Sequence, residues 1–411
     1  MSAIKWAVIF IAMLDALSVQ ADYYAKETKV LALAELTDAP IVRNDKGQRI
    51  VIGTGELKTI YFDGLMYEGK STRVYAWIGI PEGASANDKI PGIVLVHGGG
   101  GTAFKEWVEK WTAHGYAAIS IAVEGQIDER APREPGDRRG RWKKHAWAGP
   151  SRVGIYGDSD KPLEEQWMYH AVADVVLANS LLRSLPQVDH ERVGLMGISW
   201  GGIITSTVIG IDNRFAFAIP TYGCGNMSQA ANQYGRALGN NDVYKKVWDP
   251  ILRLKNVEIP TLWLSWPEDQ HFPLDKQASC YRAVSGLYLV SLIPGMRHGH
   301  MPGWNPPDSY AFANSVVKSG KPWGKQISLE IEQGRMIVFF ESSSSLDEAI
   351  LVSTTDTGIT GKRTWAQSPA KLERQAGQWV VTATWPEGTT ACFVNVKSGD
   401  LTLSSDYVER Q

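Results

Sequence analysis

The chain has 411 residues, 44% of them hydrophobic and 21% charged, a composition typical of soluble globular proteins. Its formal net charge is −2, so no strong positive field favours nucleic acid or an anionic membrane surface. The 3 cysteines form no Cys-x-x-Cys arrangement, which argues against zinc and thioredoxin-type redox sites. Length alone suggests about two to three domains.

Residues 1–21 have the pattern of a secretory signal peptide. Lys5 precedes a mostly apolar stretch, and small residues at its end place the cleavage site after Ala21. Asp15 interrupts this stretch, which is short for a bilayer span. We expect a secreted or periplasmic protein that begins near Asp22 and has no membrane span after signal removal. An uncleaved N-terminal anchor is the alternative.

The next segments predict the start of a sheet. Residues 22–49 are expected to form an extended N-terminal arm. The segments 58–62 and 72–80 alternate and are rich in β-formers, which predicts an antiparallel pair. The short apolar run 93–96 is typical of a strand buried on both faces of a parallel sheet, and it leads directly into the glycine-rich segment His97–Gly101.

A helix-type pattern and a second buried strand, residues 116–123, follow, and this alternation predicts an α/β fold with a mostly parallel sheet. Residues 124–162 interrupt it with mixed charges, Pro, Gly and Trp. They are interpreted either as a solvated surface loop or as a cap at the mouth of a site, where Trp142 and Trp147 could meet a ligand. The mixed charges argue against nucleic-acid binding.

A long amphipathic helix is predicted over residues 164–185, with His170 as a hydrogen-bonded core residue. The apolar run that follows ends in Gly197-Ile198-Ser199-Trp200-Gly201, and a helix-compatible segment comes next. Strand, sharp turn and helix around Gly-x-Ser-x-Gly form a nucleophile elbow, which exposes the serine oxygen above the sheet. Gly197 and Gly201 keep side chains away from the point where strand and helix cross.

Further strands are expected at 215–219 and 261–265, and residues 287–292 are expected to be the last strand of the sheet, with a closing helix near 310–318. From about residue 321 short alternating segments predict a small β-sandwich. The predicted division is therefore a signal peptide (1–21), an arm (22–49), a catalytic domain (50–320) and a C-terminal sandwich (321–411). Two of the cysteines, Cys224 and Cys280, are expected to form either a disulfide or buried free thiols.

An elbow serine needs a base and an orienting acid, in the chain order Ser, Asp/Glu, His. The loop after strand 261–265 contains Asp269, and the loop after strand 287–292 contains His298. Both loops lie on the carboxyl side of the sheet, as Ser199 does. Glu268 competes with Asp269 for the acid and His300 competes with His298 for the base, and Asp269 and His298 are favoured.

The same arrangement predicts an oxyanion hole and argues against a metal. The backbone N–H of Trp200 is one expected donor, and Gly99, with Gly98 as its neighbour, is the other. His97 is expected to hold this loop by hydrogen bonds. The alternative role for His298 and His300 is to bind a metal, but no carboxylate or third histidine lies at ligand spacing. No metal and no cofactor is expected.

These motifs resemble the α/β-hydrolase superfamily, in particular its acetylxylan esterase, dienelactone hydrolase and prolyl oligopeptidase-like branch. The resemblance covers about residues 50–320. Dienelactone hydrolases use a cysteine where this chain has Ser199, and glucuronoyl esterases have an arginine where it has Trp200. Prolyl oligopeptidases precede the hydrolase with a β-propeller, for which residues 22–89 are too short.

The resemblance implies a secreted serine esterase that acts through Ser199, Asp269 and His298. The expected substrate is a carboxylic ester, an acetyl group on a polysaccharide or oligosaccharide. A serine peptidase or an esterase of small non-sugar substrates is the alternative. A third hypothesis, an inactive hydrolase that serves as a binding module, is disfavoured by the intact candidate triad.

Overall fold

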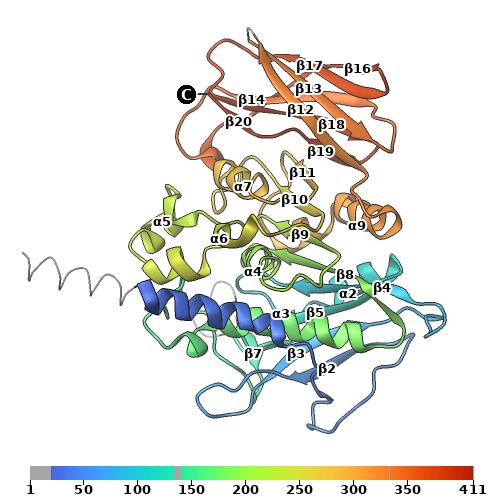
Figure 1. The fold of residues 1–411 in the computed structure, drawn as a ribbon, viewed down its shortest axis with the longest axis vertical. Coiled ribbons are helices and arrows are strands. Elements are labelled where there is room, and N and C mark those ends of the chain that lie inside the picture. The colour runs from blue at the N-terminus through green and yellow to red at the C-terminus, as the bar shows by residue number, and fades with distance from the viewer. Residues whose placement is uncertain (1–19, 134–139, 333, 411) are drawn as a thin grey trace, which may run out of the picture.

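The computed structural model describes residues 20–133, 140–332 and 334–410. Within them a central sheet of 14 strands has the order β1-β2-β3-β5-β4-β8-β9-β10-β11-β19-β18-β14-β15, with β20 paired to β18. Figure 1 shows the N-terminal strands (blue) at one end of the molecule and the C-terminal strands (orange to red) at the other. The strands up to β11 are β1 (Val42–Arg43), β2 (Leu57–Asp63), β3 (Arg73–Gly79), β4 (Ile90–Val96), β5 (Ala117–Ala122), β8 (Val188–Ile198), β9 (Phe217–Thr221), β10 (Thr261–Ser265) and β11 (Tyr288–Leu292).

The middle of this sheet is parallel, as the buried apolar runs predict. Strand β4 pairs in parallel with β5 and β8, and the parallel pairing continues through β9 and β10 to β11. Strands β2 and β3 form the expected antiparallel pair. The predicted α/β-hydrolase architecture is therefore confirmed, and it brings the carboxyl ends of β4, β8, β10 and β11 to one edge of the sheet.

Helices cover both faces of the sheet. Helices α3 and α4 pack on each other and on β8, while α2 packs on β5 and α9 on β9 and β10. The rings of Trp111 in α2 and Tyr310 in α9 lie 4.7 Å apart, so these two helices share the second face. The helices are α2 (Lys105–Ala113), α3 (Trp167–Ser184), α4 (Trp200–Val208), α5 (Gln233–Leu238), α6 (Ile251–Leu254), α7 (Leu274–Tyr281), α8 (His300–Trp304) and α9 (Pro307–Ser319). Shorter helical turns are η1 (Ala32–Glu35), η2 (Leu163–Glu165), η3 (Met227–Gln229), η4 (Tyr244–Trp248) and η5 (Thr360–Lys362).

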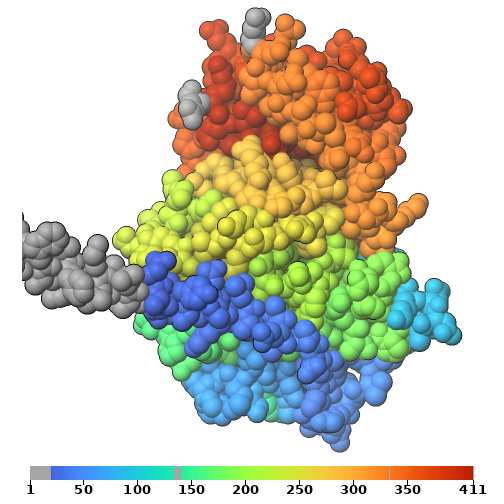
Figure 2. All heavy atoms as spheres, in the orientation of Figure 1, coloured from blue at the N-terminus to red at the C-terminus, as the bar shows by residue number. Residues whose placement is uncertain are grey.

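The N-terminal segment differs from the expected extended arm. Residues 20–31 are helical and continue into η1. Val30 and Leu33 are buried, and the Ser180 hydroxyl of α3 donates to the carbonyl oxygen of Leu36 at 2.6 Å. Tertiary packing of these few apolar residues decides the conformation, a contribution that the local sequence does not show. Figure 2 shows this segment (blue) lying against the green and yellow parts of the surface. Most of the predicted signal peptide, residues 1–19, lies outside the described residues.

The C-terminal region forms two stacked layers. A separate sheet has the order β12-β13-β17-β16, and the remaining strands extend the central sheet beyond β11. Buried residues on both layers, such as Phe340 of β13 and Phe393 of β18, belong to the same core. The strands are β12 (Gly324–Glu332), β13 (Arg335–Ser342), β14 (Glu348–Thr354), β15 (Ala366–Pro369), β16 (Lys371–Gln375), β17 (Gln378–Thr384), β18 (Ala391–Ser398), β19 (Leu401–Ser404) and β20 (Val408–Glu409).

Strand β11 is not the last strand of its sheet, contrary to the prediction, because β19 pairs with its outer edge. Val290 of β11 is aligned with Ser404 of β19 in an antiparallel pair. The Ser404 hydroxyl accepts from the Leu292 N–H at 2.8 Å, and the Asn395 side chain donates to the Leu292 carbonyl oxygen at 2.8 Å. An open edge strand is prone to pairing with other chains, and here β19 of the same chain covers that edge. The predicted domain boundary at residue 320 therefore falls between two parts that share one sheet.

None of the helices in the described residues is long and apolar enough to cross a membrane.

Candidate active site

The candidate nucleophile lies at a sharp turn between β8 and α4. Ser199 has φ 59° and ψ −113°, a strained combination for a residue with a side chain. A Cβ on Gly197 would lie 2.0 Å from the Gly201 carbonyl oxygen, and one on Gly201 would lie 2.0 Å from that of Val96. Only glycine fits at either position. The structure therefore has the elbow geometry that the Gly-x-Ser-x-Gly pattern predicts.

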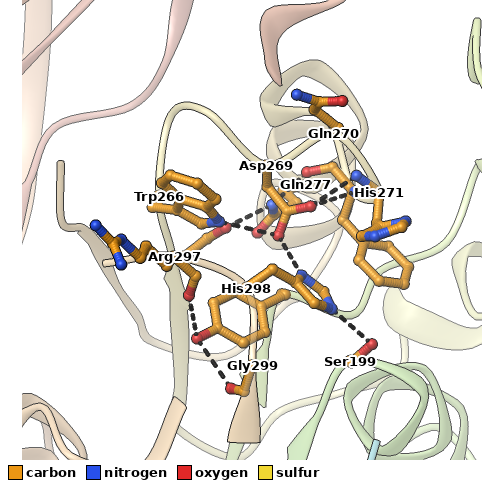
Figure 3. Close-up of polar contacts among 12 residues, drawn as sticks. Ser199, Trp266, Asp269, Gln270, His271, Gln277, Arg297, His298 and Gly299 are labelled. Carbon is orange, nitrogen blue, oxygen red and sulfur yellow. Dashed lines mark hydrogen bonds and ion pairs between the residues drawn. The ribbon is translucent and has the colours of Figure 1, made fainter. Parts of the chain in front are cut away.

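The structure brings the three predicted catalytic residues together (Figure 3). His298 Nε2 lies 2.9 Å from Ser199 Oγ, and His298 Nδ1 lies 2.8 Å from Asp269 Oδ2. The Asp269 side chain is fully buried, whereas that of His298 is 21% exposed. The serine, the imidazole and the carboxylate thus form one continuous hydrogen-bonded chain, in which Nδ1–H donates to Asp269 and Nε2 is left to accept from Ser199.

Backbone and indole donors hold the Asp269 carboxylate in place. The N–H groups of His271 and Phe272 donate to Oδ1 at 2.8 and 2.9 Å, and Trp266 Nε1 lies 3.3 Å from Oδ2. Glu268, the rival for the acid, makes no contact of this kind with the histidine, and its Oε2 has no hydrogen-bond partner among the described residues. The geometry favours Asp269 over Glu268.

His300, the rival for the base, has a different position. Its Nε2 accepts the Gly98 N–H at 3.0 Å, so it holds the glycine-rich loop, whereas Ser199 Oγ is hydrogen-bonded to His298. Burial lowers the pKa of His300 to about 4, which keeps the ring neutral and able to accept. His97 also braces this loop, as expected: Nδ1 donates to the Gly98 carbonyl oxygen at 2.7 Å and Nε2 accepts the Val123 N–H at 3.2 Å.

Three residues, Trp200, Gly99 and Gly98, are expected to form the oxyanion hole. The structure leaves the backbone N–H groups of Trp200 and Gly99 as candidate donors. Trp200 begins α4, where the first N–H groups have no helical acceptor and the helix dipole is positive. The N–H of Gly99 makes no backbone hydrogen bond in the part of the chain that the structure describes. The N–H of Gly98 is already used by His300. The prediction that Gly98 assists as a donor is therefore corrected: it acts through the shape of the loop, since a Cβ there would lie 2.8 Å from the Ile198 carbonyl oxygen.

A cavity of about 520 Å³ opens above Ser199, and Arg152 is one of its lining residues. Sequence analysis did not single out Arg152, because a lone arginine in a mixed-charge segment forms no motif. Its guanidinium lies 4.6 Å from the centre of the Trp200 ring, and Nη1 donates to the Gly154 carbonyl oxygen at 2.5 Å. Nη2 would lie 3.1 Å from a Cβ on Gly99. A fixed cation therefore stands beside the candidate oxyanion hole, where it favours the development of negative charge.

The cap tryptophans do not line this cavity. Trp142 donates from Nε1 to the Gly100 carbonyl oxygen at 2.9 Å, so it holds the glycine-rich loop from outside. Trp147 packs instead against Tyr61, with ring centres 5.6 Å apart, and under the guanidinium of Arg73. Within the predicted loop or cap, β6 (Gln126–Arg130) and β7 (Trp142–Lys144) form an antiparallel pair, and the two tryptophans expected to meet a ligand pack elsewhere.

Aromatic rings surround the candidate base. Tyr222 lies 4.6 Å from the His298 ring and its hydroxyl donates to the Arg297 carbonyl oxygen at 3.0 Å. Phe272 stacks on the other side at 6.0 Å. These contacts fix the orientation of the imidazole. Sequence analysis missed Tyr222, whose only signal was its position directly after a buried strand.

Three further expectations concern the cysteines, His170 and metals. Cys224 and Cys280 are buried free thiols, so the structure has the second of the two expected alternatives. His170 is buried, and its Nε2 lies 2.9 Å from the Glu164 carbonyl oxygen, as expected of a core histidine. No group of three or more metal-binding side chains occurs within residues 20–133, 140–332 and 334–410.

Two protein-family profiles and several solved structures match parts of this chain. A family profile for acetyl xylan esterase matches residues 34–228, and a profile for the prolyl oligopeptidase family matches residues 156–303. The crystal structure of acetyl xylan esterase 1 from Thermoanaerobacterium sp. JW/SL YS485 aligns with a TM-score of 0.51 and 18% identity over 69% of this chain and 90% of that chain. An acylaminoacyl peptidase of Pyrococcus horikoshii aligns with a TM-score of 0.46 and 19% identity over 64% of this chain and 41% of that chain.

Among curated proteins, the uncharacterized peptidase YuxL of Bacillus subtilis (strain 168) is 25% identical over 241 residues. The match covers 55% of this chain and only 32% of that protein. The acetyl xylan esterase structure, at 18% identity and a TM-score of 0.51, establishes the fold alone, whereas the two family profiles indicate hydrolase families.

Proposed function

We propose that this chain, a member of the α/β-hydrolase superfamily, is a serine esterase that removes acetyl groups from a carbohydrate. The observation that carries this proposal is the hydrogen-bonded chain from Asp269 through His298 to Ser199, with its distances of 2.8 and 2.9 Å. The acetyl xylan esterase profile over residues 34–228 supports an esterase. The polar lining of the cavity, with Arg152 and His271 beside the triad, suits a hydroxyl-rich substrate.

The proposed reaction follows from the positions of the atoms. His298 Nε2 takes the proton of Ser199 Oγ as that oxygen attacks the ester carbonyl carbon, and a C–O bond forms. The N–H groups of Trp200 and Gly99 stabilise the oxyanion of the tetrahedral intermediate. The intermediate then expels the sugar oxygen, to which His298 returns the proton, and an acetyl-enzyme remains.

Hydrolysis of the acetyl-enzyme uses the same residues. His298 takes a proton from water, whose oxygen attacks the acyl carbon. The Ser199–acyl bond breaks, Ser199 recovers a proton from His298, and acetate leaves. Asp269 keeps the imidazole in the tautomer that accepts at Nε2 and stabilises the imidazolium in both halves of the reaction.

The prolyl oligopeptidase profile over residues 156–303 favours a second candidate, a serine peptidase, because the same triad cleaves amides. The deciding experiment compares hydrolysis of 4-nitrophenyl acetate, acetylated xylan and aminoacyl anilides by the wild type and by Ser199→Ala. We expect ester hydrolysis, weak or no anilide hydrolysis, and loss of about 10⁴-fold or more in the folded Ser199→Ala protein. Anilides hydrolysed faster than esters would identify a peptidase.

The compartment is also a proposal. The pattern of residues 1–21 supports export, with the mature protein beginning near Asp22. An acetylated polysaccharide outside the cell would be accessible to such a protein.

A further inference from the structure

A second cavity, of about 360 Å³, adjoins the one above the serine. The two cavities share His271 and His298, so they meet at the candidate base. Ile359 and Lys362, which belong to the C-terminal region, also line the second cavity. Its size lies within the range of small-molecule sites, about 300–1,000 Å³.

The lining of this second cavity combines an indole with unpaired polar groups. Trp266 lies on one side, together with Glu268, whose Oε2 has no hydrogen-bond partner among the described residues. Arg236 and Lys362 also line the cavity, and neither forms an ion pair within that part of the chain. Buried acceptors without partners are costly in a folded protein. An apolar ring beside free donors and an acceptor suits a sugar unit, which has one flat face and several hydroxyl groups.

The C-terminal wall is fixed firmly to the loop of the catalytic acid. A Cβ on Gly361, in η5, would lie 2.1 Å from the Asp269 carbonyl oxygen and 2.6 Å from the Gln270 nitrogen. The Thr360 hydroxyl accepts the Leu274 N–H at 2.8 Å. Backbone contact this close fixes η5, and with it the backbone of Lys362, against the loop of Asp269.

The mechanism decides which part of the substrate would enter this cavity. The histidine must protonate the departing oxygen, so the leaving alcohol lies on the side of His298 that faces away from the oxyanion donors. Trp200 and Gly99 line the first cavity only. The second cavity, on the side of His271 and His298, is therefore on the side of the leaving alcohol.

We propose that the second cavity binds a sugar unit of the leaving alcohol, and that the C-terminal region completes this subsite through Ile359 and Lys362. This inference rests on the proposed esterase function. It gives the C-terminal region a role in choosing oligomeric substrates, with Glu268 accepting a sugar hydroxyl and Lys362 donating to another.

The test compares two esters that differ in the alcohol: 4-nitrophenyl acetate, whose alcohol is a single ring, and acetylated xylobiose. The measured quantity is the ratio of kcat/KM for the disaccharide to kcat/KM for the nitrophenyl ester. Loss of one hydrogen bond to a charged group corresponds to a change of about tenfold or more. We therefore expect Lys362→Met and Glu268→Gln each to lower this ratio by about tenfold, mainly through a higher KM for the disaccharide.

The matched control is Lys371→Met, since Lys371 is an exposed lysine of the same region that does not line the cavity. It should leave the ratio unchanged. Ratios for Lys362→Met and Glu268→Gln within twofold of the wild type would overturn the subsite. A wild type that cleaves the nitrophenyl ester but not the disaccharide would overturn it too. A folded wild type that cleaves neither ester would instead refute the esterase proposal itself.

Discussion

Gly361→Ala is the sharpest test of how the candidate catalytic acid, Asp269, is held. The added methyl group would lie 2.1 Å from the Asp269 carbonyl oxygen and 2.3 Å from its carbonyl carbon. Real Cβ atoms essentially never approach other atoms below 3.0 Å, and the obstacle is backbone that cannot rotate aside. Either η5 or the loop of Asp269 must move by about 1 Å.

Two effects of different size should follow. Overpacking of this kind costs about 1–3 kcal/mol in the free energy of unfolding, which lowers the melting temperature. A misplacement of about 1 Å in a catalytic group can cost about 10²-fold in rate. We therefore expect kcat for 4-nitrophenyl acetate to fall by about 10- to 100-fold at temperatures where the protein remains folded.

The assay measures kcat, KM and the melting curve of each variant. Gly53→Ala is the control, because a Cβ there has nothing within 4 Å and should change neither rate nor stability. Gly361→Ala introduced into the Asp269→Asn protein should cost little further rate, since the two changes act on the same group. A Gly361→Ala protein with wild-type kcat and melting temperature would refute the claim that η5 positions Asp269.

Four other outcomes are expected. Asp269→Asn should lower kcat by about 10⁴-fold without unfolding the protein, whereas Glu268→Gln should cost far less on a nitrophenyl ester; the reverse order would move the acid by one residue. His298→Asn should be more damaging than His300→Asn, which leaves only the loop N–H without its acceptor, and kcat/KM for both variants decides this. Burial lowers the pKa of His300 to about 4, below its unfolded value of about 6.5, as it does for His97 and His145. The unfolded state therefore binds more protons between these values, and the melting temperature should fall as pH drops from about 6.5 towards 4. The fall should be smaller in His300→Asn, and an equal fall would contradict the assignment for His300. Mass spectrometry of the exported protein should find an N-terminus near Asp22, and a retained segment 1–21 would indicate an anchor.

Local patterns were sufficient for the parallel strands of the sheet and for the candidate nucleophile. The elbow at Ser199 and the buried strands follow from short runs whose meaning does not depend on distant residues. Asp269 and His298 follow from the rule that loops after parallel strands share one edge of the sheet. The sequence favours Asp269 over Glu268 and His298 over His300, and the side-chain geometry of the folded protein separates these neighbours.

Features that depend on long-range packing could not be predicted. Arg152 approaches Gly99 because the segment after β7 folds back over the site, and no sequence motif predicts this contact. The contact of Gly361 with Asp269 joins two segments far apart in the chain, so the local sequence does not predict it. A glycine in a short turn with no other explanation is only a weak signal of such a close contact. The helix at residues 20–31 and the pairing of β19 with β11 also depend on surfaces that form only in the folded protein.

The pairing of β19 with β11 has a consequence for how the chain is made. The Leu292 N–H finds its acceptor in Ser404, which is synthesised 112 residues later. Until then the outer edge of β11 has no neighbour, and an unpaired edge is the part of a nascent protein most open to wrong partners. The part of the sheet that carries the candidate site is therefore expected to complete its fold only after β19 has been synthesised. A gene shortened at residue 320 would yield a chain that has every candidate catalytic residue and an uncovered sheet edge, prone to aggregate.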